Sequence, residues 1–271
     1  MANVPNAAEE PLEHVTVVVP TFQEADNIEP FLRAVRASMP EADVLVCDDN
    51  SPDGTGIRAD EIAAELGAIT VLHRPKKEGL GAAYRHGFRH AVEGGADIVV
   101  QMDVDFSHPP EQVAELVSTV RGGADVAVGS RYVPGGGTPD WPLYRRLLST
   151  YGNVYAGWQL GLAIRDATSG FRAYRASALA DISVASTRAN GYGFQIETGF
   201  RLSAVGAKVV EVPLVFLDRT RGSSKMSVAI MAENLALVTW WGLCRRAPGV
   251  TGRFRRTRLA KRLTGSAVAG G

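Results

Sequence analysis

The stretch ADIVVQMDVDFSHPP, residues 96–110, joins a short apolar segment to two aspartates and then to a pair of prolines. The apolar, β-branched residues at its start predict a buried strand, since short uninterrupted apolar runs are typical of parallel sheets covered on both faces. Asp103 and Asp105 follow this strand, and the alternation of a strand predicts that both side chains point to the same side. The question is what a chain gains from two carboxylates at the end of a buried strand.

The rest of the chain repeats this arrangement of strand and turn. Four further segments are short, apolar and bounded by turn residues, namely 14–20, 42–49, 68–74 and 124–131. Segments with helical periodicity lie between them, at 28–39, 57–66, 80–93 and 110–121. This alternation predicts an α/β fold with a Rossmann-like, mostly parallel sheet and helices on both faces.

Polar residues gather where four of these strands end. They are Pro20 to Glu24, Asp48 to Ser51, Asp103 to Asp105, and Ser130 with Arg131. Polar residues after a strand can simply form turns. In open parallel sheets, however, ligands bind at the carboxyl ends of the strands. Four such ends on one sheet edge therefore predict a binding site.

The aspartate pair has two readings. A D-x-D sequence alone is a weak signal, and an aspartate after a strand often forms a turn or caps a helix. At the edge of a parallel sheet, two hard oxygen ligands also suit Mg²⁺ or Mn²⁺ that is shared with the phosphates of a substrate. Such an ion would stabilise the negative charge that develops on a diphosphate leaving group.

Other motifs exclude some classes of protein. The sequence GLGAAYRHG, residues 79–87, lacks the third glycine of a dinucleotide fingerprint and does not follow the first strand, which argues against nicotinamide binding. Cys47 and Cys244 are the only cysteines, too few for a disulfide framework. The apolar run Val15–Val19 is shorter than a signal-peptide core, and no basic residue precedes Arg33, so we expect a protein that faces the cytoplasm.

Charge is unevenly distributed although the formal net charge is zero. Residues 1–233 contain 29 acidic and 21 basic residues, whereas the eight cations between Arg245 and Arg262 are unaccompanied by any acid. A tail with eight positive charges can contribute roughly 1 kcal/mol per cation at an anionic membrane surface. It could also be a nonspecific arm, but no nucleic-acid motif or base-stacking aromatics accompany it, so we expect no nucleic-acid partner.

An ordered series of motifs carries a family resemblance. It comprises VVVPTFQEADNI, DDNSPDGT, KEGLGAAYRHG, MDVDFSHPP, GSRYVPGG, WPLYRRLLS, DATSGFRAYR, GYGFQIE and VPLVFLDRTRGSSK. Together they closely resemble the polyprenol-phosphate (dolichol-phosphate) mannose synthases of the family 2 glycosyltransferases. The resemblance implies a GT-A fold, a divalent metal, and inverting transfer of mannose from GDP-mannose to a polyprenyl monophosphate.

Residue by residue, the resemblance implies a donor site and a metal site. The donor residues are Pro20, Thr21, Glu24, Asp48, Asp49, Asp103, Arg219 and Lys225. Arg219 and Lys225 would hold the donor diphosphate from a loop. The metal ligands would be Asp103 and Asp105, with Ser107 at a position where some relatives carry glutamine.

The resemblance also implies an acceptor site for the lipid phosphate, formed by Arg131, Arg145 and Ser149. Arginine suits this role because its guanidinium pairs with two phosphate oxygens and stays charged. A phosphate monoester is already anionic near neutral pH, so it can attack without a strong general base. The catalytic residues would then be Asp105, Arg131 and Arg145, with Asp105 helping to orient the acceptor.

The chain divides into four expected parts: an extension at 1–13, the GT-A domain at 14–227, an amphipathic interfacial helix at 228–246 and a basic tail at 247–271. Trp240 and Trp241, followed by Arg245 and Arg246, resemble a membrane-interface anchor, although they could equally belong to a helix packed on the domain. We therefore expect a peripheral enzyme on the cytoplasmic face of a membrane, with an integral membrane protein as a possible partner.

Two alternatives stay open. One is the same chemistry with UDP-glucose or another nucleotide sugar as donor, since single residues such as Asp49 do not fix the base. The other is a catalytically inactive, membrane-associated scaffold that keeps the fold. The joint presence of the acid pair and the basic residues argues against the scaffold, because inactivity would remove the reason to keep them together.

Overall fold

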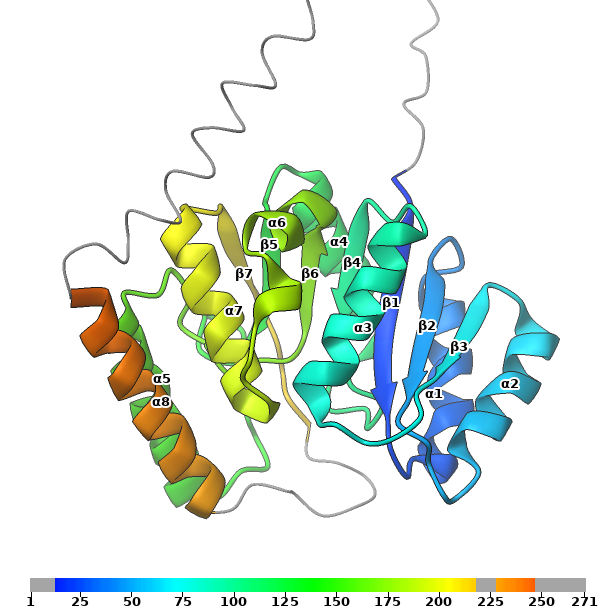
Figure 1. Cartoon of the computed structure of the whole chain (residues 1–271), viewed down its shortest axis with the longest axis horizontal. Coiled ribbons are helices and arrows are strands. Elements are labelled where there is room, and N and C mark those ends of the chain that lie inside the picture. Colours follow the sequence, from blue (N-terminus) through cyan, green and yellow to red (C-terminus); the bar gives the residue numbers. More distant parts are fainter. Residues whose placement is uncertain (1–12, 218–227, 247–271) are drawn as a thin grey trace, which may run out of the picture.

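A seven-stranded mixed sheet forms the centre of the molecule (Figure 1). The structure is a computed structural model, and it describes residues 13–217 and 228–246, with side chains of 228–234 and 246 left out. The strands are β1 (Val15–Thr21), β2 (Asp43–Asp48), β3 (Ile69–His73), β4 (Ile98–Gln101), β5 (Val126–Ser130), β6 (Arg172–Arg175) and β7 (Val209–Pro213). Their order in the sheet is β3-β2-β1-β4-β6-β5-β7.

The strand directions confirm the predicted, mostly parallel sheet, and two strands, β6 and β7, are added to the five that were predicted. β1 pairs in parallel with β2 and β4, β2 with β3, and β5 with β7. β6 is antiparallel to both of its neighbours, β4 and β5. All five predicted strands are present, but β5 does not lie beside β4 because β6 separates them.

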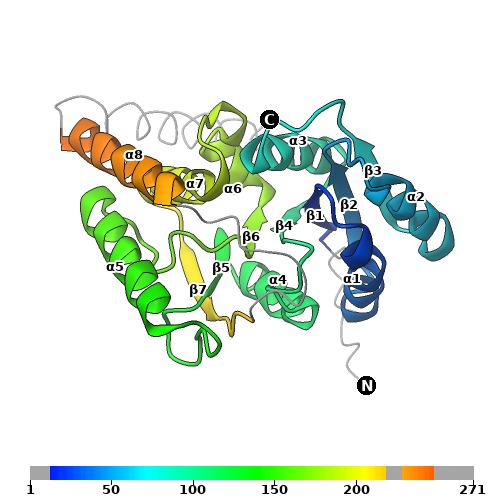
Figure 2. The ribbon, with the colours of Figure 1, turned by 90° about the horizontal axis from the view of Figure 1, so that it is seen from below.

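The helices cover the sheet on both faces. They are α1 (Ala25–Ser38), α2 (Thr55–Leu66), α3 (Leu80–Glu93), α4 (Val113–Arg121), α5 (Leu143–Leu160), α6 (Ala176–Asp181), α7 (Gly191–Val205) and α8 (Val228–Arg246). Two 3₁₀ turns, η1 (Pro110–Gln112) and η2 (Val184–Ser186), complete the elements. Figure 2 shows α1 and α4 on one side of the sheet and α3, α6 and α7 on the other.

Alternation along the strands divides the core into two layers. In β1, Val17 and Val19 pack with α1, α2 and α4, whereas Val18 packs with α3 and the helices on its side. Each of these valines is fully buried, and burying a side chain of this size contributes about 1.5–3 kcal/mol. Burial on both faces explains why the strands read as continuous apolar runs rather than as an alternating pattern.

Helices α5 and α8 lie side by side at one end of the sheet (Figures 1 and 2). The hydroxyl groups of Tyr155 and Thr239 join them through a hydrogen bond of 2.8 Å. Among the described residues, no helix combines the length and apolar character that crossing a bilayer requires.

Candidate active site

Three adjacent strands end at the same edge of the sheet, and the chain turns sharply after each. β2, β1 and β4 are neighbours, and Figure 2 looks onto the edge where they end. Gln23, Asn50 and Phe106 follow these strands with φ angles of 59°, 56° and 60°. Non-glycine residues in this left-handed region are uncommon and are found preferentially at functional sites. Three of the five non-glycine residues with a left-handed backbone in the described part of the chain therefore lie at the edge that the sequence predicted as a binding site.

Asp48 organises the turn after β2. Its carboxylate accepts hydrogen bonds from the Thr21 hydroxyl at 3.0 Å and from the backbone and hydroxyl of Ser51 at 3.0 and 2.6 Å. Asp48 thus ties the end of β1 to the turn after β2, and the role seen in the structure is to hold these two segments together. Pro20 precedes Thr21 in β1 and pairs in register with Cys47.

Glu24 and Asp53 hold the loop after β1 in the same way. The backbone N–H of Glu24 donates to the Thr55 hydroxyl at 2.9 Å, and the N–H of Ala25 donates to the Asp53 carboxylate at 3.2 Å. The Glu24 carboxylate accepts a hydrogen bond from the Asn27 side chain at 2.8 Å. The two loops that would surround a nucleoside are consequently fixed to each other.

Asp49 is buried against an arginine. The Arg74 guanidinium donates to the Asp49 carboxylate and, through Nη2, to Glu78 at 3.0 Å. Burial raises the pKa of Asp49, and the nearby Arg74 opposes that shift without cancelling it. The sequence named Asp49 as a donor-site residue but missed Arg74.

Asp103 is anchored from the opposite layer of the molecule. The hydroxyl of Tyr84, which is fully buried in α3, donates to Asp103 Oδ1 at 2.8 Å. Burial, together with the charge of Asp103, raises the pKa of Tyr84 well above its usual value, so the phenol stays a donor. The backbone N–H of Asp103 donates to His108 Nδ1 at 3.2 Å, and burial lowers the pKa of this histidine. A neutral His108 therefore holds the loop that carries the two aspartates by accepting this hydrogen bond.

Asp105 and Ser107 complete the predicted metal group. Asp105 is buried and accepts a hydrogen bond from the backbone of Ser107 at 3.0 Å. The Ser107 hydroxyl is also buried and has no hydrogen-bond partner among the described residues. An unpartnered buried oxygen beside two carboxylates fits a hard divalent cation. No group of three or more His, Cys, Asp or Glu side chains in the described part of the chain could hold a metal alone, so such an ion would need substrate or water oxygens as well.

The geometric reason given for the aspartate pair is wrong. β4 ends at Gln101, and Phe106 has a left-handed backbone, so Asp103 and Asp105 lie in a bent loop rather than along a strand. Strand alternation therefore does not decide where their side chains point. The hydrogen bonds from Tyr84 and Ser107 do.

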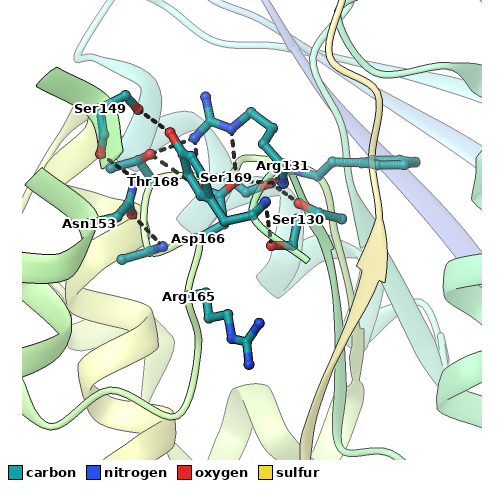
Figure 3. Close-up of polar contacts among 12 residues, drawn as sticks. Ser130, Arg131, Ser149, Asn153, Arg165, Asp166, Thr168 and Ser169 are labelled. Atoms are coloured by element: carbon teal, nitrogen blue, oxygen red, sulfur yellow. Dashed lines mark hydrogen bonds and ion pairs between the residues drawn. The ribbon is translucent and has the colours of Figure 1, made fainter. Parts of the chain in front are cut away.

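The residues that the resemblance assigned to the acceptor centre on Arg131, which follows β5 (Figure 3). Its Nε and Nη2 donate to the two carboxylate oxygens of Asp166 at 2.7 and 2.6 Å, and its backbone N–H donates to the same carboxylate at 3.0 Å. Nη2 also donates to the Thr168 hydroxyl at 2.7 Å. Burial acts to raise the pKa of Asp166, but Arg131 outweighs it and the pKa is lowered. Nη1 is the guanidinium nitrogen that these contacts leave unused.

Arg145 and Ser149 lie close to Arg131, as the resemblance implied. The Arg145 guanidinium carbon lies 3.9 Å above the ring centre of Trp141, and that of Arg131 lies 5.3 Å from the same ring. The hydroxyl of Tyr132, the residue after Arg131, donates to Ser149 Oγ at 2.6 Å. α5 thus presents Arg145 and Ser149 to the end of β5, with the buried Trp141 between the two arginines.

The loop before β6 connects the two sides of the site. Asp166 and Thr168 in this loop contact Arg131. A side chain placed at Gly170 would lie 3.5 Å from both Asp103 Oδ2 and His108. The acid pair and the arginines therefore lie on either side of one short loop, while Arg219 and Lys225 fall outside the described residues.

Sequence reasoning missed four supporting residues: Arg74, Tyr84, Trp141 and Asp166. Tyr84, Trp141 and Asp166 stand inside motifs that carried the resemblance, KEGLGAAYRHG, WPLYRRLLS and DATSGFRAYR. The partners of Tyr84 and Asp166 lie 19 and 35 positions away along the chain, so local spacing offered no signal for these contacts. Trp141 contacts Arg145, four positions away, and Arg131, which precedes it by ten positions.

A mixed sheet of this order, with an aspartate pair after its fourth strand and a basic cluster across one loop, defines the class of glycosyltransferases with the GT-A fold. Residues 16–183 match the family model described as Glycosyl transferase family 2. The chain belongs to that family and is a glycosyltransferase.

Two curated relatives match nearly the whole chain. The undecaprenyl-phosphate mannosyltransferase of Micrococcus luteus is 46% identical over 240 residues, which cover 89% of this chain and 98% of the relative. The polyprenol monophosphomannose synthase of Mycolicibacterium smegmatis is 42% identical over 246 residues, covering 90% and 93%. Among solved structures, the mannosyltransferase PcManGT of Pyrobaculum calidifontis, in complex with GDP-Man and Mn²⁺, matches with a TM-score of 0.60 at 18% identity, covering 95% of this chain and 76% of that one. The last likeness concerns the fold alone.

Proposed function

We propose that the protein transfers mannose, with inversion, from GDP-mannose to a polyprenyl monophosphate. The observation that carries this proposal is the placement of two arginines, Arg131 and Arg145, around Trp141 on the other side of a single loop from the Asp103–Asp105 pair. A site for two separate anions is what transfer between a nucleotide sugar and a lipid phosphate requires. The names of the two relatives support mannose and a polyprenyl phosphate, and they do not favour a glucosyltransferase or a scaffold.

The donor side would bind the nucleotide through the loops after β1 and β2. Pro20, Thr21 and Glu24 form the first loop, and Asp48 holds it against the second. Asp49 would accept hydrogen bonds from the base. Because both loops are already fixed by Asp48 and Asp53, little ordering entropy would be lost when the nucleoside binds.

Asp103, Asp105 and Ser107 would hold a divalent cation, Mg²⁺ or Mn²⁺. When bound, such an ion supplies positive charge to the departing diphosphate. Tyr84 fixes the orientation of Asp103 by donating to it, which leaves the other carboxylate oxygen, Oδ2, facing Gly170. Arg219 and Lys225 would add positive charge to the same diphosphate.

The acceptor phosphate would be held by Arg145, Ser149 and the remaining nitrogen of Arg131. One phosphate oxygen attacks the anomeric carbon and forms a new C–O bond, while the bond from that carbon to the diphosphate oxygen breaks and GDP leaves with the electron pair. No proton needs to be removed from the attacking dianion, so the step requires no strong general base. Asp105 helps to orient the acceptor.

A lipid acceptor requires a surface that meets the membrane, and α5 offers one. Seven of its large apolar side chains are 44–73% exposed: Leu143, Tyr144, Leu147, Leu148, Tyr151, Val154 and Trp158. They recur at helical spacing, so they form one stripe along the helix. On the neighbouring α8, Leu235, Trp240 and Leu243 are also exposed. We call these ten side chains the apolar face.

The apolar face supports peripheral attachment to a membrane, and we place the protein on the cytoplasmic side. Groups of large exposed apolar side chains usually mark a membrane or protein interface. Trp, Tyr and Leu are typical of helices that lie in the headgroup region. Of the two tryptophans predicted as an anchor, Trp240 is 63% exposed, whereas Trp241 stacks on Phe200 at 6.5 Å. Arg145, in the first turn of α5, would bring the phosphate from this face to the site. An integral membrane partner would bind on the same surface.

The test is transfer of radiolabelled sugar into an organic-extractable polyprenyl phosphate. GDP-mannose and UDP-glucose are supplied separately, first with Mg²⁺ and then with EDTA. Metal-dependent labelling from GDP-mannose alone is expected. Labelling from UDP-glucose alone would overturn the donor, and labelling that persists in EDTA would overturn the metal.

Arg145→Ala tests the acceptor side in the same assay. The KM for polyprenyl phosphate should rise about tenfold or more, because a charge-assisted contact to phosphate is lost, while the KM for GDP-mannose should stay unchanged. Arg165→Ala is the matched control, since Arg165 is exposed and points away from the cluster (Figure 3). An equal rise in both KM values would show that Arg145 serves the whole site instead.

A further inference from the structure

Helix α5 carries two of the residues assigned to the acceptor, and both lie in a half of the helix that is outside the core. No residue in the range 143–152 is buried, and this range includes Arg145 and Ser149. The first buried residue of α5 is Asn153, which is 4% exposed. The buried Trp141 holds the chain just before the helix begins. Within the helix, the position of the two acceptor residues therefore depends on what holds Asn153.

Asn153 joins α5 to the loop before β6 (Figure 3). Its Oδ1 accepts a hydrogen bond from the backbone N–H of Ala167 at 2.8 Å, and its Nδ2 donates to the Ser149 carbonyl at 3.0 Å. A backbone N–H only donates and a carbonyl only accepts, so these two partners fix which way the amide points. One side chain thus connects the helical turn that carries Ser149 with the loop.

The loop itself is held from the side of the sheet. The backbone N–H groups of Arg165 and Asp166 donate to the Glu211 carboxylate on β7, each at 3.0 Å. Arg172, the first residue of β6, donates from Nη2 to the Ala167 carbonyl at 3.0 Å. Because these contacts come from β6 and β7, the loop is a fixed support on which α5 rests.

Ala167 stands between two residues that contact Arg131. Asp166 and Thr168 both accept hydrogen bonds from the Arg131 guanidinium, and Ala167 is fully buried. The same three-residue segment therefore holds Arg131 through its side chains and α5 through its backbone. It is the common support for the parts of the acceptor site that come from β5 and from α5.

A buried asparagine attaches a helix in a more specific way than an apolar residue does. An amide taken out of water costs stability unless its hydrogen bonds are replaced, and here they are replaced by two bonds of defined direction. Apolar contacts tolerate sliding, whereas a shift along the helix breaks these bonds. A buried asparagine is known to fix register in this way between packed helices.

The register of α5 matters because of where its acceptor residues lie. Ser149 and Arg145 precede Asn153 by about one and two turns, so the three side chains project from the same side of the helix. A shift of one residue would turn the helix by about 100° and move it about 1.5 Å along its axis. Such a shift would carry Arg145 and Ser149 away from Arg131.

We propose that Asn153 is a positioning residue for the acceptor: by accepting the Ala167 N–H it fixes the register of α5 in which Arg145 and Ser149 lie beside Arg131. The inference rests on the proposed function, since it concerns how the acceptor site of that reaction is assembled. Asn153 does not bind the phosphate itself, because its amide is buried and bonded to the backbone on both sides.

The experiment replaces Asn153 by threonine in the full chain and measures mannose transfer to polyprenyl phosphate. A threonine hydroxyl can donate to the carbonyl four residues earlier, and threonine and asparagine have similar helix propensities, so the contact that is lost is the one with Ala167. The KM for polyprenyl phosphate should rise about tenfold, the size expected for one hydrogen bond, while the KM for GDP-mannose stays within about twofold.

Amide hydrogen exchange followed by NMR tests the same contact without turnover. The Ala167 N–H should exchange about tenfold faster in Asn153→Thr, because it has lost its acceptor. The Asp166 N–H, which is bound to Glu211, should exchange as in the wild type. Faster exchange at both positions would show that the loop is not a fixed support, and the inference would fail.

Gln159→Leu is the matched control. Gln159 is another buried polar residue of α5, but it lies against α8, where a side chain placed at Gly242 would overlap it. Its replacement should leave the KM for polyprenyl phosphate within about twofold of the wild type. Asn153→Asp keeps an acceptor for the Ala167 N–H and should retain most of the affinity that Asn153→Thr loses.

A double variant separates positioning from a general loss of order. In Arg145→Ala one of the residues that Asn153 positions is already gone. Adding Asn153→Thr to Arg145→Ala should therefore raise the KM for polyprenyl phosphate by less than about threefold, because the two residues act through one contact with the acceptor. Independent losses from the two changes would mean that Asn153 does not act through Arg145.

Two kinetic results would overturn the inference. One is an Asn153→Thr protein with the wild-type KM for polyprenyl phosphate. The other is an equal rise in the KM values for both substrates, which is the effect of a purely structural residue. With either result, a wild type that transfers mannose leaves the proposed function standing. A wild type that transfers no mannose to polyprenyl phosphate overturns the proposed function and the inference together.

Discussion

Two buried aspartate–arginine pairs lie at the same edge of the sheet, and they are bonded differently. In the region proposed to bind the acceptor, here called the acceptor region, Asp166 receives three hydrogen bonds from Arg131, with both carboxylate oxygens engaged. In the region proposed to bind the donor, the donor region, Asp49 receives one from Arg74, which divides its guanidinium between Asp49 and Glu78. Arg131 is therefore held by its partner, whereas Asp49 keeps acceptor positions for something else.

The pKa values of Asp49 and Asp166 are shifted in opposite directions, although burial and a neighbouring arginine act on both carboxyl groups. Burial pushes both upward, but only in Asp166 do Arg131 and its hydrogen bonds outweigh burial and lower the pKa. For Asp49 the balance leaves the pKa raised. The comparison teaches that a saturated pair fixes the fold around a site, while an unsaturated one is suited to bind a ligand.

The largest expected effect is a loss of activity without a loss of stability, and it comes from a change at Asp103. Asp103→Asn keeps the oxygen that accepts the Tyr84 hydroxyl but removes the negative charge that would hold a cation. We expect kcat to fall about a thousandfold or more, with the thermal midpoint within a few degrees of the wild type. The measurement is mannose transfer beside a calorimetric melt.

Glu93→Gln, an exposed change in α3, is the control and should alter neither quantity. Normal turnover by Asp103→Asn would remove Asp103 from the metal group.

The second prediction concerns Asp166, whose two carboxylate oxygens are both engaged, and here the expected loss is in stability. Asp166→Ala leaves Arg131 buried without its counter-charge, which should cost about 3–5 kcal/mol of unfolding free energy. Urea titration followed by circular dichroism measures the loss. Asp140→Ala, in an exposed position of the loop before α5, should cost almost nothing. If Asp166→Ala were as stable as the wild type, Asp166 could not be the support of Arg131.

The third prediction extends the comparison from the two pairs to the surfaces of the two regions. α5, on the acceptor side, exposes an apolar stripe, whereas α2, on the donor side, exposes a single large apolar residue, Ile57. Leu147→Glu with Trp158→Glu should weaken binding to anionic lipid vesicles about tenfold or more in a sedimentation assay, because two apolar contacts with lipid are lost.

Activity towards a short-chain acceptor in detergent should be unchanged by the same pair of substitutions. Ile57→Glu should have no effect on vesicle binding. Equal losses from both changes would mean that general surface charge, and not the apolar face, governs attachment.

The donor region could be predicted from the sequence more fully than the acceptor region. Its strands β1 to β4 are parallel, and β1, β2 and β4 are buried on both faces, so each of these three reads as a short apolar run followed by polar residues at the site edge. The predicted helix at 80–93 matches the bounds of α3. Local pattern was sufficient here because strand and helix alternate regularly along the chain.

The acceptor region departs from that pattern at β6 and α5. β6 is a four-residue antiparallel strand whose first residue, Arg172, is a fully buried cation satisfied by backbone carbonyls, so it lacks the apolar run of a core strand. α5 exposes large apolar side chains, which reverses the usual relation between hydrophobicity and burial. Arg131 was placed at the site edge by its position after a predicted strand, Arg145 and Ser149 were named only through the family resemblance, and no spacing rule predicted Asp166.

The smallest effect expected is a difference in pH dependence between the two aspartates. The lowered pKa of Asp166 means that it contributes stability above the ordinary aspartate pKa of about 3.9, and that this contribution is lost as the pH falls. The raised pKa of Asp49 has the opposite effect, because the folded protein holds that proton more tightly and loses stability as the pH rises and Asp49 ionises.

Urea titrations between about pH 3.5 and pH 6.5 measure this difference as free energies of unfolding. As the pH rises, the free energy of unfolding of the wild type should increase relative to that of Asp166→Asn and decrease relative to that of Asp49→Asn. Both differences should level off once the carboxyl groups are ionised in the folded and unfolded chains. Parallel trends would mean that the two pairs are equivalent, and the division into a saturated support and an open binding group would then fail.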